Sequence, residues 1–232
     1  MFRFKEFTVQ QDKTAMKVGT DGVILGAWVT IEPEELHALD IGCGTALIAL
    51  MLAQRSTATI DAVEIDQNSA EQAAENIKNS KWCKQINIHN IDINNFNQKI
   101  KYTTIVCNPP FFNDSLPSPD KGRTTARHTV SLSYANLIKV VKNLLDANGR
   151  FSLILPTNES RHFEELASGL LYPYRRCEVR GKVGAPIKRI MSEYRLTPTT
   201  QVEVSEISIR EAIGNDFTQE YRDITADFYL KF

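Results

Sequence analysis

The segment Asn108-Pro109-Pro110-Phe111 combines residue types that could hold a planar amino group. The Asn108 side chain and the Pro109 backbone each offer a carbonyl oxygen, and two acceptors match the two hydrogens of an NH₂ group. Two prolines restrict this segment, and the Phe111 ring offers a flat face on which an aromatic base can stack. We interpret residues 108–111 as a candidate catalytic clamp. The alternative is a proline-rich turn whose phenylalanines pack in the core.

Such a clamp suits one kind of chemistry. An amine conjugated with an aromatic ring is a poor nucleophile, because its lone pair is delocalised into the ring. Acceptors that favour a pyramidal nitrogen stabilise the transition state more than the ground state. An electrophilic methyl group held in line with that nitrogen could then be transferred without a strong base.

A second candidate site is the segment "LDIGCGT", which contains Asp40, Gly42 and Gly44. Glycines at a strand-to-helix turn allow positive φ and a close approach of a ligand to the backbone. The spacing does not match a full dinucleotide fingerprint, because Leu47 stands where the third glycine would be. A tight turn without a ligand is the alternative.

Acidic residues end the next two expected strands. Glu64 lies in the segment "VEID" that ends the second expected strand, where a carboxylate could accept hydrogen bonds from both ribose hydroxyls of a nucleoside. Asp92 ends "INIHNID" in the same expected crevice, where it could bind an adenine amino group or simply cap a turn. The glycine turn and Glu64 together favour a bound nucleoside cofactor.

The elements that must position these residues alternate between strands and helices. This alternation predicts an α/β fold, with a doubly wound, mostly parallel sheet. Expected strands are 38–42, 59–66, 86–92, 102–108 and 149–156, and expected helices are 46–55, 69–80 and 132–145. Residues 174–183 and 187–196 predict a hairpin, 201–210 an edge strand and 216–230 a terminal helix. We expect a single domain, with an N-terminal segment 1–35 and a core 36–232.

Composition sets broad limits. The 232 residues include 27 basic and 28 acidic side chains, a balance that neither supports nor excludes a nucleic-acid partner. The spacing of the four cysteines and four histidines suggests reduced thiols and no metal site. No segment predicts a membrane span. We therefore expect a cytoplasmic protein without an obligatory protein partner.

Basic residues gather in two parts of the chain despite the balanced total. Lys121, Arg123 and Arg127 follow the tetrad, in a predicted loop over 112–128. The expected C-terminal strands carry Arg175, Arg176, Arg180, Lys182, Lys188 and Arg189. These residues could form a positive rim that binds RNA, or they could be ordinary charges on the faces of strands.

The motifs "DIGCG", "VEID" and "NPPF" together resemble class I S-adenosylmethionine-dependent methyltransferases that modify amino groups. The segments "MKVGTDGVILGAW", "NPPFF", "ARH" and "EYRDITADFYLKF" look more closely like the bacterial tRNA1(Val) (adenine(37)-N6)-methyltransferase family. The resemblance implies a Rossmann-like methyltransferase sheet of seven strands, with the last strand antiparallel. It also implies S-adenosyl-L-methionine as cofactor and tRNA as partner.

The resemblance further implies a role for individual residues. Lys17, Thr20 and Asp21 would lie near the methionine end of the cofactor, and Asp40, Gly42, Gly44 and Asn108 would line it. Glu64 would hold the ribose and Asp92 the cofactor's adenine amine. Asn108, Pro109, Pro110 and Phe111 would form the catalytic clamp around the target adenine, and Arg123 and Arg127 would contact the substrate.

Two other functions remain open at the level of sequence. A related enzyme could methylate a protein glutamine or a guanine amino group in ribosomal RNA, because both acceptors present a planar NH₂ group. Only about 35 residues precede the core, which leaves little room for a separate recognition domain. A non-enzymatic, cofactor-binding RNA chaperone would have no need of Asn108.

Overall fold

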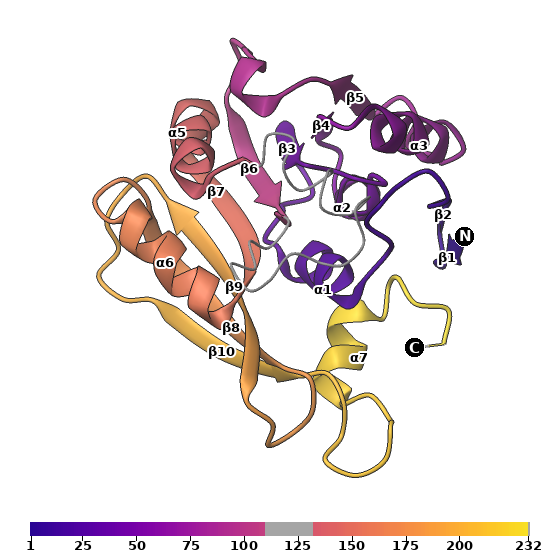
Figure 1. Ribbon diagram of the computed structural model, residues 1–232, viewed down its shortest axis with the longest axis vertical. Helices are drawn as coiled ribbons and strands as arrows, with labels where there is room; N and C mark the ends of the chain where they lie inside the picture. Colours follow the sequence, from indigo (N-terminus) through magenta and orange to yellow (C-terminus); the bar gives the residue numbers. More distant parts are fainter. Residues whose placement is uncertain (110–131, 232) are drawn as a thin grey trace, which may run out of the picture.

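The computed structural model describes residues 1–109 and 132–231 (Figure 1). Pro110, Phe111, the predicted loop 112–128 and its basic residues Lys121, Arg123 and Arg127 lie outside the described residues.

In the described part of the chain, eight strands form the main sheet, in the order β10-β8-β9-β7-β6-β3-β4-β5. The strands are β3 (His37–Ile41), β4 (Thr59–Glu64), β5 (Ile86–Asn90), β6 (Tyr102–Cys107), β7 (Leu145–Pro156), β8 (Tyr172–Arg180), β9 (Ile187–Arg195) and β10 (Glu203–Ser208). The strands expected between residues 38 and 156 are confirmed, with ends that differ by a few residues. The order of β5, β4, β3 and β6 reverses direction beside β3, as in doubly wound folds.

One strand runs against the others. β9 pairs antiparallel with both β7 and β8, which confirms the predicted hairpin. β3 to β9 are therefore the seven expected strands, and the last of them is antiparallel. β10 pairs parallel with β8 and adds the predicted edge strand, so the described sheet is one strand wider than the resemblance implies.

Helices cover both faces of this sheet (Figure 1). The described helices are α1 (Thr20–Trp28), α2 (Leu47–Arg55), α3 (Gln67–Lys78), α5 (Tyr134–Leu144), α6 (Thr157–Ala167) and α7 (Gln219–Thr225), with a 3₁₀ turn, η1 (Ile93–Asn95). α1, α2, α3 and α7 contribute to one apolar core, and α5, α6 and η1 to the other. The central strands contribute side chains to both cores, because successive residues point to opposite faces of the sheet: Ala38 belongs to the first core and Leu39 to the second.

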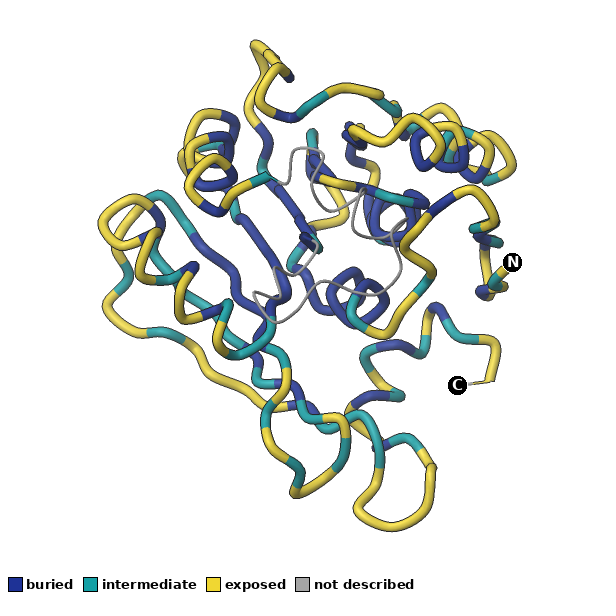
Figure 2. The backbone as a smooth tube through the Cα atoms, viewed as in Figure 1, coloured by how far each residue is buried: buried dark blue, intermediate teal, exposed yellow. Residues whose placement is uncertain are grey.

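Burial follows this layering. α2 is almost wholly buried, whereas α3 and α6 each keep an exposed face (Figure 2). α1 is buried from Gly22 to Trp28. A helix without a polar face shows no amphipathic period, and two glycines lower its helix propensity, so no local pattern predicts α1. It forms a helix because packing against α2 and the sheet outweighs that propensity.

The two chain ends meet beside α7. β1 (Phe2–Arg3) and β2 (Thr8–Val9) form a small antiparallel pair, and the Lys5 N–H donates to the Phe228 carbonyl. α7 begins at its cap Thr218 but is shorter than the expected helix 216–230. It ends early because the chain turns back after Thr225 and brings Tyr229 against the ring of Phe4.

Candidate active site

The carboxyl ends of three neighbouring strands bring the candidate residues to one edge of the sheet. Ile41 of β3 is in register with Val63 of β4 and with Cys107 of β6. The residues that follow are Gly42, Glu64 and Asn108, so the three motifs lie side by side. Ligands in doubly wound folds bind at this edge, beside the point where the strand order reverses.

The glycine turn is held open by its backbone conformation. Gly42 and Gly44 have φ of +69° and +56°, a region that strongly favours glycine. No described atom outside the chain neighbours lies within 4 Å of a Cβ built on either residue. The amides of Gly42 and Cys43 both donate to the Val63 carbonyl, which ties the turn to β4. The turn therefore presents bare backbone to open space, as a cradle for a ligand requires.

Glu64 anchors the same turn from the neighbouring strand. Its Oε2 accepts from the Gly44 N–H at 2.9 Å, and its Oε1 accepts from the Asp66 N–H at 2.9 Å. Burial raises the pKa of this carboxyl, although the two backbone hydrogen bonds act in the opposite direction. Each carboxylate oxygen can accept a second hydrogen bond, so Glu64 can hold the loop and still bind hydroxyl groups.

Asp40 lies beneath the turn rather than on its surface. It is 1% exposed, and its Oδ2 accepts from the Ala49 N–H at 3.0 Å, in the first turn of α2. The residue before α2, Ala46, has the left-handed φ of 63° that non-glycine residues rarely adopt. Asp40 therefore fixes the start of α2 and with it the shape of the glycine turn.

Replacing Asp40 with asparagine is expected to stabilise the protein at alkaline pH. Burial raises the pKa of the Asp40 carboxyl from 3.8 to about 7. The folded state then binds this proton more tightly than the unfolded state, so the free energy of unfolding falls as pH rises from about 4 through about 7. Asparagine keeps an acceptor for Ala49 without the charge, and the gain should be about 4 kcal/mol near pH 8. Urea unfolding of both proteins near pH 5 and pH 8 checks this; an identical pH dependence would contradict it.

Asn108 lies beside the first turn of α1. It is half-buried, and Pro109 is buried. A Cβ built on Gly22 would stand 3.7 Å from Asn108 Nδ2 and 3.1 Å from Leu47 Cδ2. The N-terminal segment therefore borders the tetrad. A side chain at position 22 would be tight against Leu47, whereas 3.7 Å to Asn108 is an ordinary van der Waals distance.

Asp92 caps a turn, which is one of the two roles that the sequence analysis offered for it. Its Oδ1 accepts from the backbone N–H and from the side-chain Nδ2 of Asn94, both at 2.8 Å. It follows β5, and the amide of the intervening Ile91 donates to the Glu64 carbonyl. Asp92 therefore stands at the same sheet edge as Glu64.

The three predicted N-terminal residues differ in their contacts. Lys17 donates to the carbonyls of Gln11 and Thr14, the latter at 3.0 Å. Thr20 begins α1 and is exposed. Asp21 Oδ2 accepts from Arg189 Nε of β9 at 2.8 Å, in an ion pair that joins α1 to the sheet.

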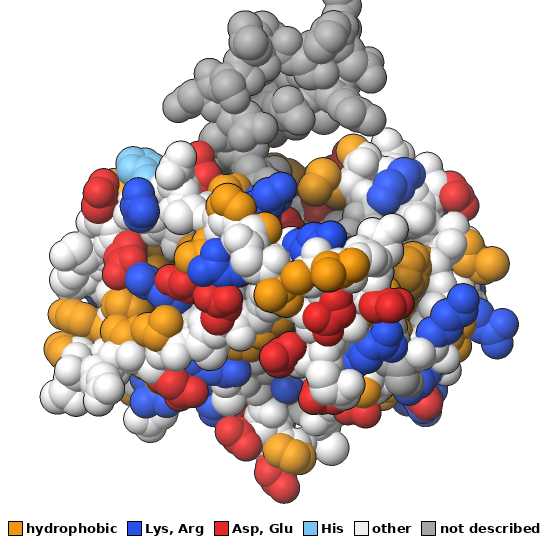
Figure 3. Space-filling model, turned by 90° about the horizontal axis from the view of Figure 1, so that it is seen from below, with side chains coloured by type: hydrophobic (Ala, Val, Ile, Leu, Met, Phe, Trp, Pro, Cys, Tyr) orange, Lys and Arg blue, Asp and Glu red, His pale blue; other side chains and the backbone are white. Residues whose placement is uncertain are grey.

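The structure favours the structural reading for most basic residues of the C-terminal strands. Their ion pairs are Arg175 with Glu193, Arg176 with Glu164, Arg180 with Glu206 and Arg189 with Asp21. Lys182 donates to the Gly214 carbonyl at 3.4 Å, and Lys188 is exposed. Figure 3 shows basic and acidic side chains interspersed on the face it views, rather than a continuous basic area. On the C-terminal strands, acidic partners therefore neutralise most of the charge of the expected positive rim.

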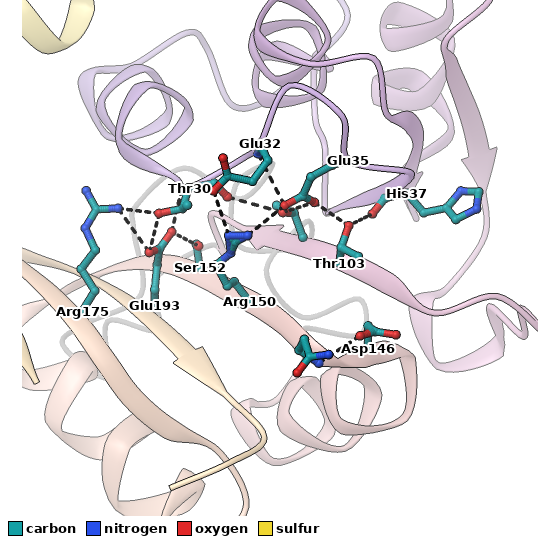
Figure 4. A network of polar contacts seen from close by, with 12 residues as sticks. Thr30, Glu32, Glu35, His37, Thr103, Asp146, Arg150, Ser152, Arg175 and Glu193 are labelled. Carbon is teal, nitrogen blue, oxygen red and sulfur yellow. Dashed lines mark hydrogen bonds and ion pairs between the residues drawn. The ribbon is translucent and has the colours of Figure 1, made fainter. Parts of the chain in front are cut away.

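A buried polar network holds the other end of α1 (Figure 4). Glu193 is fully buried and accepts from the Thr30 N–H at 2.6 Å, Ser152 Oγ at 3.0 Å and Arg175 Nη1 at 3.2 Å. The Arg175 guanidinium also stacks on the Trp28 ring, 4.1 Å from its centroid. β9 thus contacts both ends of α1: Arg189 binds Asp21 in its first turn, and Glu193 binds Thr30 just after its last residue. These contacts hold α1 beside Asn108.

Two buried amides on α3 were missed by sequence reasoning. Gln72 and Asn76 are each 2% exposed and bind backbone groups of residues 10–13. A signal did exist, because both lie on the stripe of α3 that also carries Ala73 and Ile77. A polar amide on an apolar stripe must find partners, since burial without hydrogen bonds is costly.

Within 1–109 and 132–231, no group of three or more His, Cys, Asp or Glu side chains is placed to hold a metal ion. Within the same ranges, no helix is both long and apolar enough to cross a membrane.

Comparison with known proteins places this geometry in a family. Residues 29–171 match the family model of the methyltransferase small domain. The tRNA1(Val) (adenine(37)-N6)-methyltransferase of Bacteroides fragilis YCH46 is 47% identical over 99% of this chain and 98% of its own length. The enzyme of that name from Parabacteroides distasonis is 42% identical, with the same coverage of both chains.

Solved structures agree at the level of fold. A predicted O-methyltransferase from Agrobacterium tumefaciens superposes with a TM-score of 0.70 at 14% identity, over 90% of this chain and 96% of its own. An N-methyltransferase from Bradyrhizobium japonicum, in complex with S-adenosyl-L-homocysteine, gives 0.52 at 13% identity, over 70% and 79%. These two show a shared Rossmann-like class I fold. With near full-length relatives above 40% identity, the chain belongs to the tRNA1(Val) (adenine(37)-N6)-methyltransferase family.

Proposed function

We propose that this protein transfers a methyl group from S-adenosyl-L-methionine to the N6 nitrogen of adenine 37 in tRNA1(Val). The observation that carries the proposal is the meeting of the glycine turn, Glu64 and Asn108 at one edge of the sheet. Identity of 39–47% over nearly the whole chain with relatives of that name supports the choice of substrate.

The residues present fit this cofactor. The open backbone at Gly42 and Gly44 leaves room for it, and Glu64 retains acceptor capacity for the two ribose hydroxyls. We assign Asp92 to the adenine amine and the segment from Lys17 to Asp21 to the methionine end. Asp40 acts from below by fixing α2. When bound, the cofactor supplies an electrophilic methyl group on a sulfonium sulfur.

The clamp acts on the amine of the target base. Asn108 Oδ1 and the Pro109 carbonyl oxygen accept hydrogen bonds from its two N–H groups. These hydrogen bonds become stronger as the nitrogen becomes pyramidal. A carbon–nitrogen bond forms while the carbon–sulfur bond breaks, which leaves S-adenosyl-L-homocysteine. The methylated nitrogen then loses a proton to solvent. We assign Pro110 to stiffening the clamp and Phe111 to stacking on the base, both from sequence.

Binding of the tRNA depends on whether the target adenine is paired. An adenine in an anticodon loop is unpaired, so moving it into a pocket costs less than extruding it from a duplex. Arg123 and Arg127 remain our candidates for phosphate contacts, because the C-terminal arginines are paired with acids. We also propose a cytoplasmic location, which a tRNA substrate supports, and no need for an obligatory protein partner.

Labelled-methyl transfer tests the proposal. The full-length protein is incubated with labelled cofactor and total tRNA from cells that lack this enzyme, and the nucleosides are then separated. We expect the label in N6-methyladenosine. Label in a methylated guanosine, or only in added protein or ribosomal RNA, would contradict the proposal and move the activity to one of the related acceptors.

A further inference from the structure

Residues 10–18 form an extended segment, here called the N-terminal strap, that joins β2 to α1. The strap has neither helix nor strand, so its backbone groups need other partners. Asn76 of α3 supplies the first pair: its Oδ1 accepts from the Gln10 N–H at 2.8 Å, and its Nδ2 donates to the Gln10 carbonyl at 2.9 Å. One side-chain amide therefore pairs with Gln10 as a neighbouring strand would.

Gln72 supplies the second attachment, one turn earlier on the same face of α3. Its Oε1 accepts from the Asp12 N–H at 3.0 Å and from the Lys13 N–H at 3.2 Å. Gln72 and Asn76 are each 2% exposed, so the side-chain ends of these bonds are buried, whereas Asp12 and Lys13 themselves are exposed. The two amides hold the first half of the strap on α3.

Asn76 also reaches the glycine turn. Its Nδ2 donates to the Thr45 carbonyl at 3.0 Å, in addition to the Gln10 carbonyl. Thr45 lies between Gly44, which donates to Glu64, and Ala46, which has the left-handed conformation. A single buried amide thus bonds to both the strap and the turn that we assign to the cofactor.

The far half of the strap leads to the tetrad. The Val18 N–H donates to Gln11 Oε1 at 2.8 Å, and Lys17 donates to the Thr14 carbonyl, so the strap also holds its own shape. α1 follows directly, and its Gly22 faces Asn108. A continuous series of contacts therefore runs from the glycine turn through Asn76 and the strap to the clamp.

We propose that Asn76 is a positioning residue that couples the glycine turn to the N-terminal strap, so that cofactor binding orders the strap through this one amide. The inference rests on the proposed cofactor and deepens it. Loss of the amide leaves the Thr45 carbonyl and the Gln10 groups without this partner.

Three alanine variants separate the coupling from simple packing. Asn76→Ala removes both connections. Gln72→Ala loosens the strap but leaves the Asn76 bond to Thr45. Asn79→Ala changes an exposed asparagine at the end of the same helix and serves as the control. Calorimetry measures S-adenosyl-L-homocysteine binding to each full-length protein, and trypsin cleavage at Lys13 and Lys17 reports on the strap.

In the wild type, saturating S-adenosyl-L-homocysteine should slow cleavage at both lysines. Asn76→Ala should weaken binding about tenfold or more and lose this protection even at saturation. Gln72→Ala should be cleaved faster yet bind with an affinity close to that of the wild type, and Asn79→Ala should match the wild type in both assays.

Wild-type binding or protection in Asn76→Ala would overturn the inference, as would equal losses of affinity in Asn76→Ala and Gln72→Ala. Absence of binding to the wild type would overturn the proposed function and this inference with it. Should Asn76→Ala fail to fold, Asn76→Leu removes the same hydrogen bonds with a side chain of similar size, and binding and protection are judged in the same way.

Discussion

Asn108→Ala is expected to lower kcat about 10²- to 10³-fold while most of the affinity for S-adenosyl-L-homocysteine is retained. The reason is that the Asn108 oxygen strengthens its hydrogen bond only as the amine becomes pyramidal, so its loss falls on the transition state. Single-turnover methyl transfer to unmodified tRNA measures the rate, and calorimetry measures cofactor binding in the same preparations.

The control for this substitution is Asn148→Ala, which changes an exposed asparagine in the first part of β7. Activity equal to that of the wild type is expected for it. An Asn108→Ala protein that transfers methyl groups at the full rate would refute the clamp mechanism. A protein that loses rate and cofactor binding equally would show that Asn108 serves the cofactor rather than the amine.

Glu64→Ala is expected to weaken cofactor binding about 10²-fold. The substitution removes a charged acceptor for the ribose hydroxyls, and hydrogen bonds to charged groups contribute about 1.5–3 kcal/mol each. It also removes the partner of the Gly44 N–H, so the glycine turn loses its anchor on β4. Glu64→Gln should lose less, because one oxygen remains to accept a hydrogen bond.

Calorimetric titration with S-adenosyl-L-homocysteine checks this order of affinities. Thermal unfolding of the same samples shows whether the fold is retained. Glu71→Ala, which changes an exposed glutamate of α3, is the matched control and should bind as the wild type does. A dissociation constant for Glu64→Ala that stays close to the wild-type value would contradict the role given to Glu64.

The sequence predicted the elements that have a clear period. β3, β4, β5 and β6 are short apolar segments, and α3 and α5 have apolar stripes, so their positions could be read directly. α1 was not predicted, because it is buried on almost all sides and so has no amphipathic pattern. α6 was not predicted either, because it begins at Thr157, directly after the last residue of β7, with no loop residues to mark its start.

Site residues were predictable where a motif fixes the backbone. Gly42 and Gly44 have the positive φ that the turn required, and Glu64 lies beside them. Partners from distant parts of the chain were not predictable. Arg189 looked like a free cation, but the fold brings Asp21 to it, and Arg180 meets Glu206 on the neighbouring strand. Local spacing carries no information on such pairs.

The same limit explains Asp40 and Asn76. The motif placed Asp40 at the cofactor turn, but only the packing of α2 shows that its carboxylate is buried against Ala49. For Asn76, only its place on the apolar stripe of α3 could be read from the sequence. Its bonds to Gln10 and Thr45 depend on how the N-terminal strap crosses α3, which no local pattern specifies.

Methyl transfer to two matched transcripts tests the central claim most directly. One is unmodified tRNA1(Val), and the other is the same transcript with guanine in place of adenine 37. We expect the wild-type protein to add one methyl group to the first, recovered as N6-methyladenosine, and none to the second. Equal labelling of both transcripts, or of neither, would contradict the account.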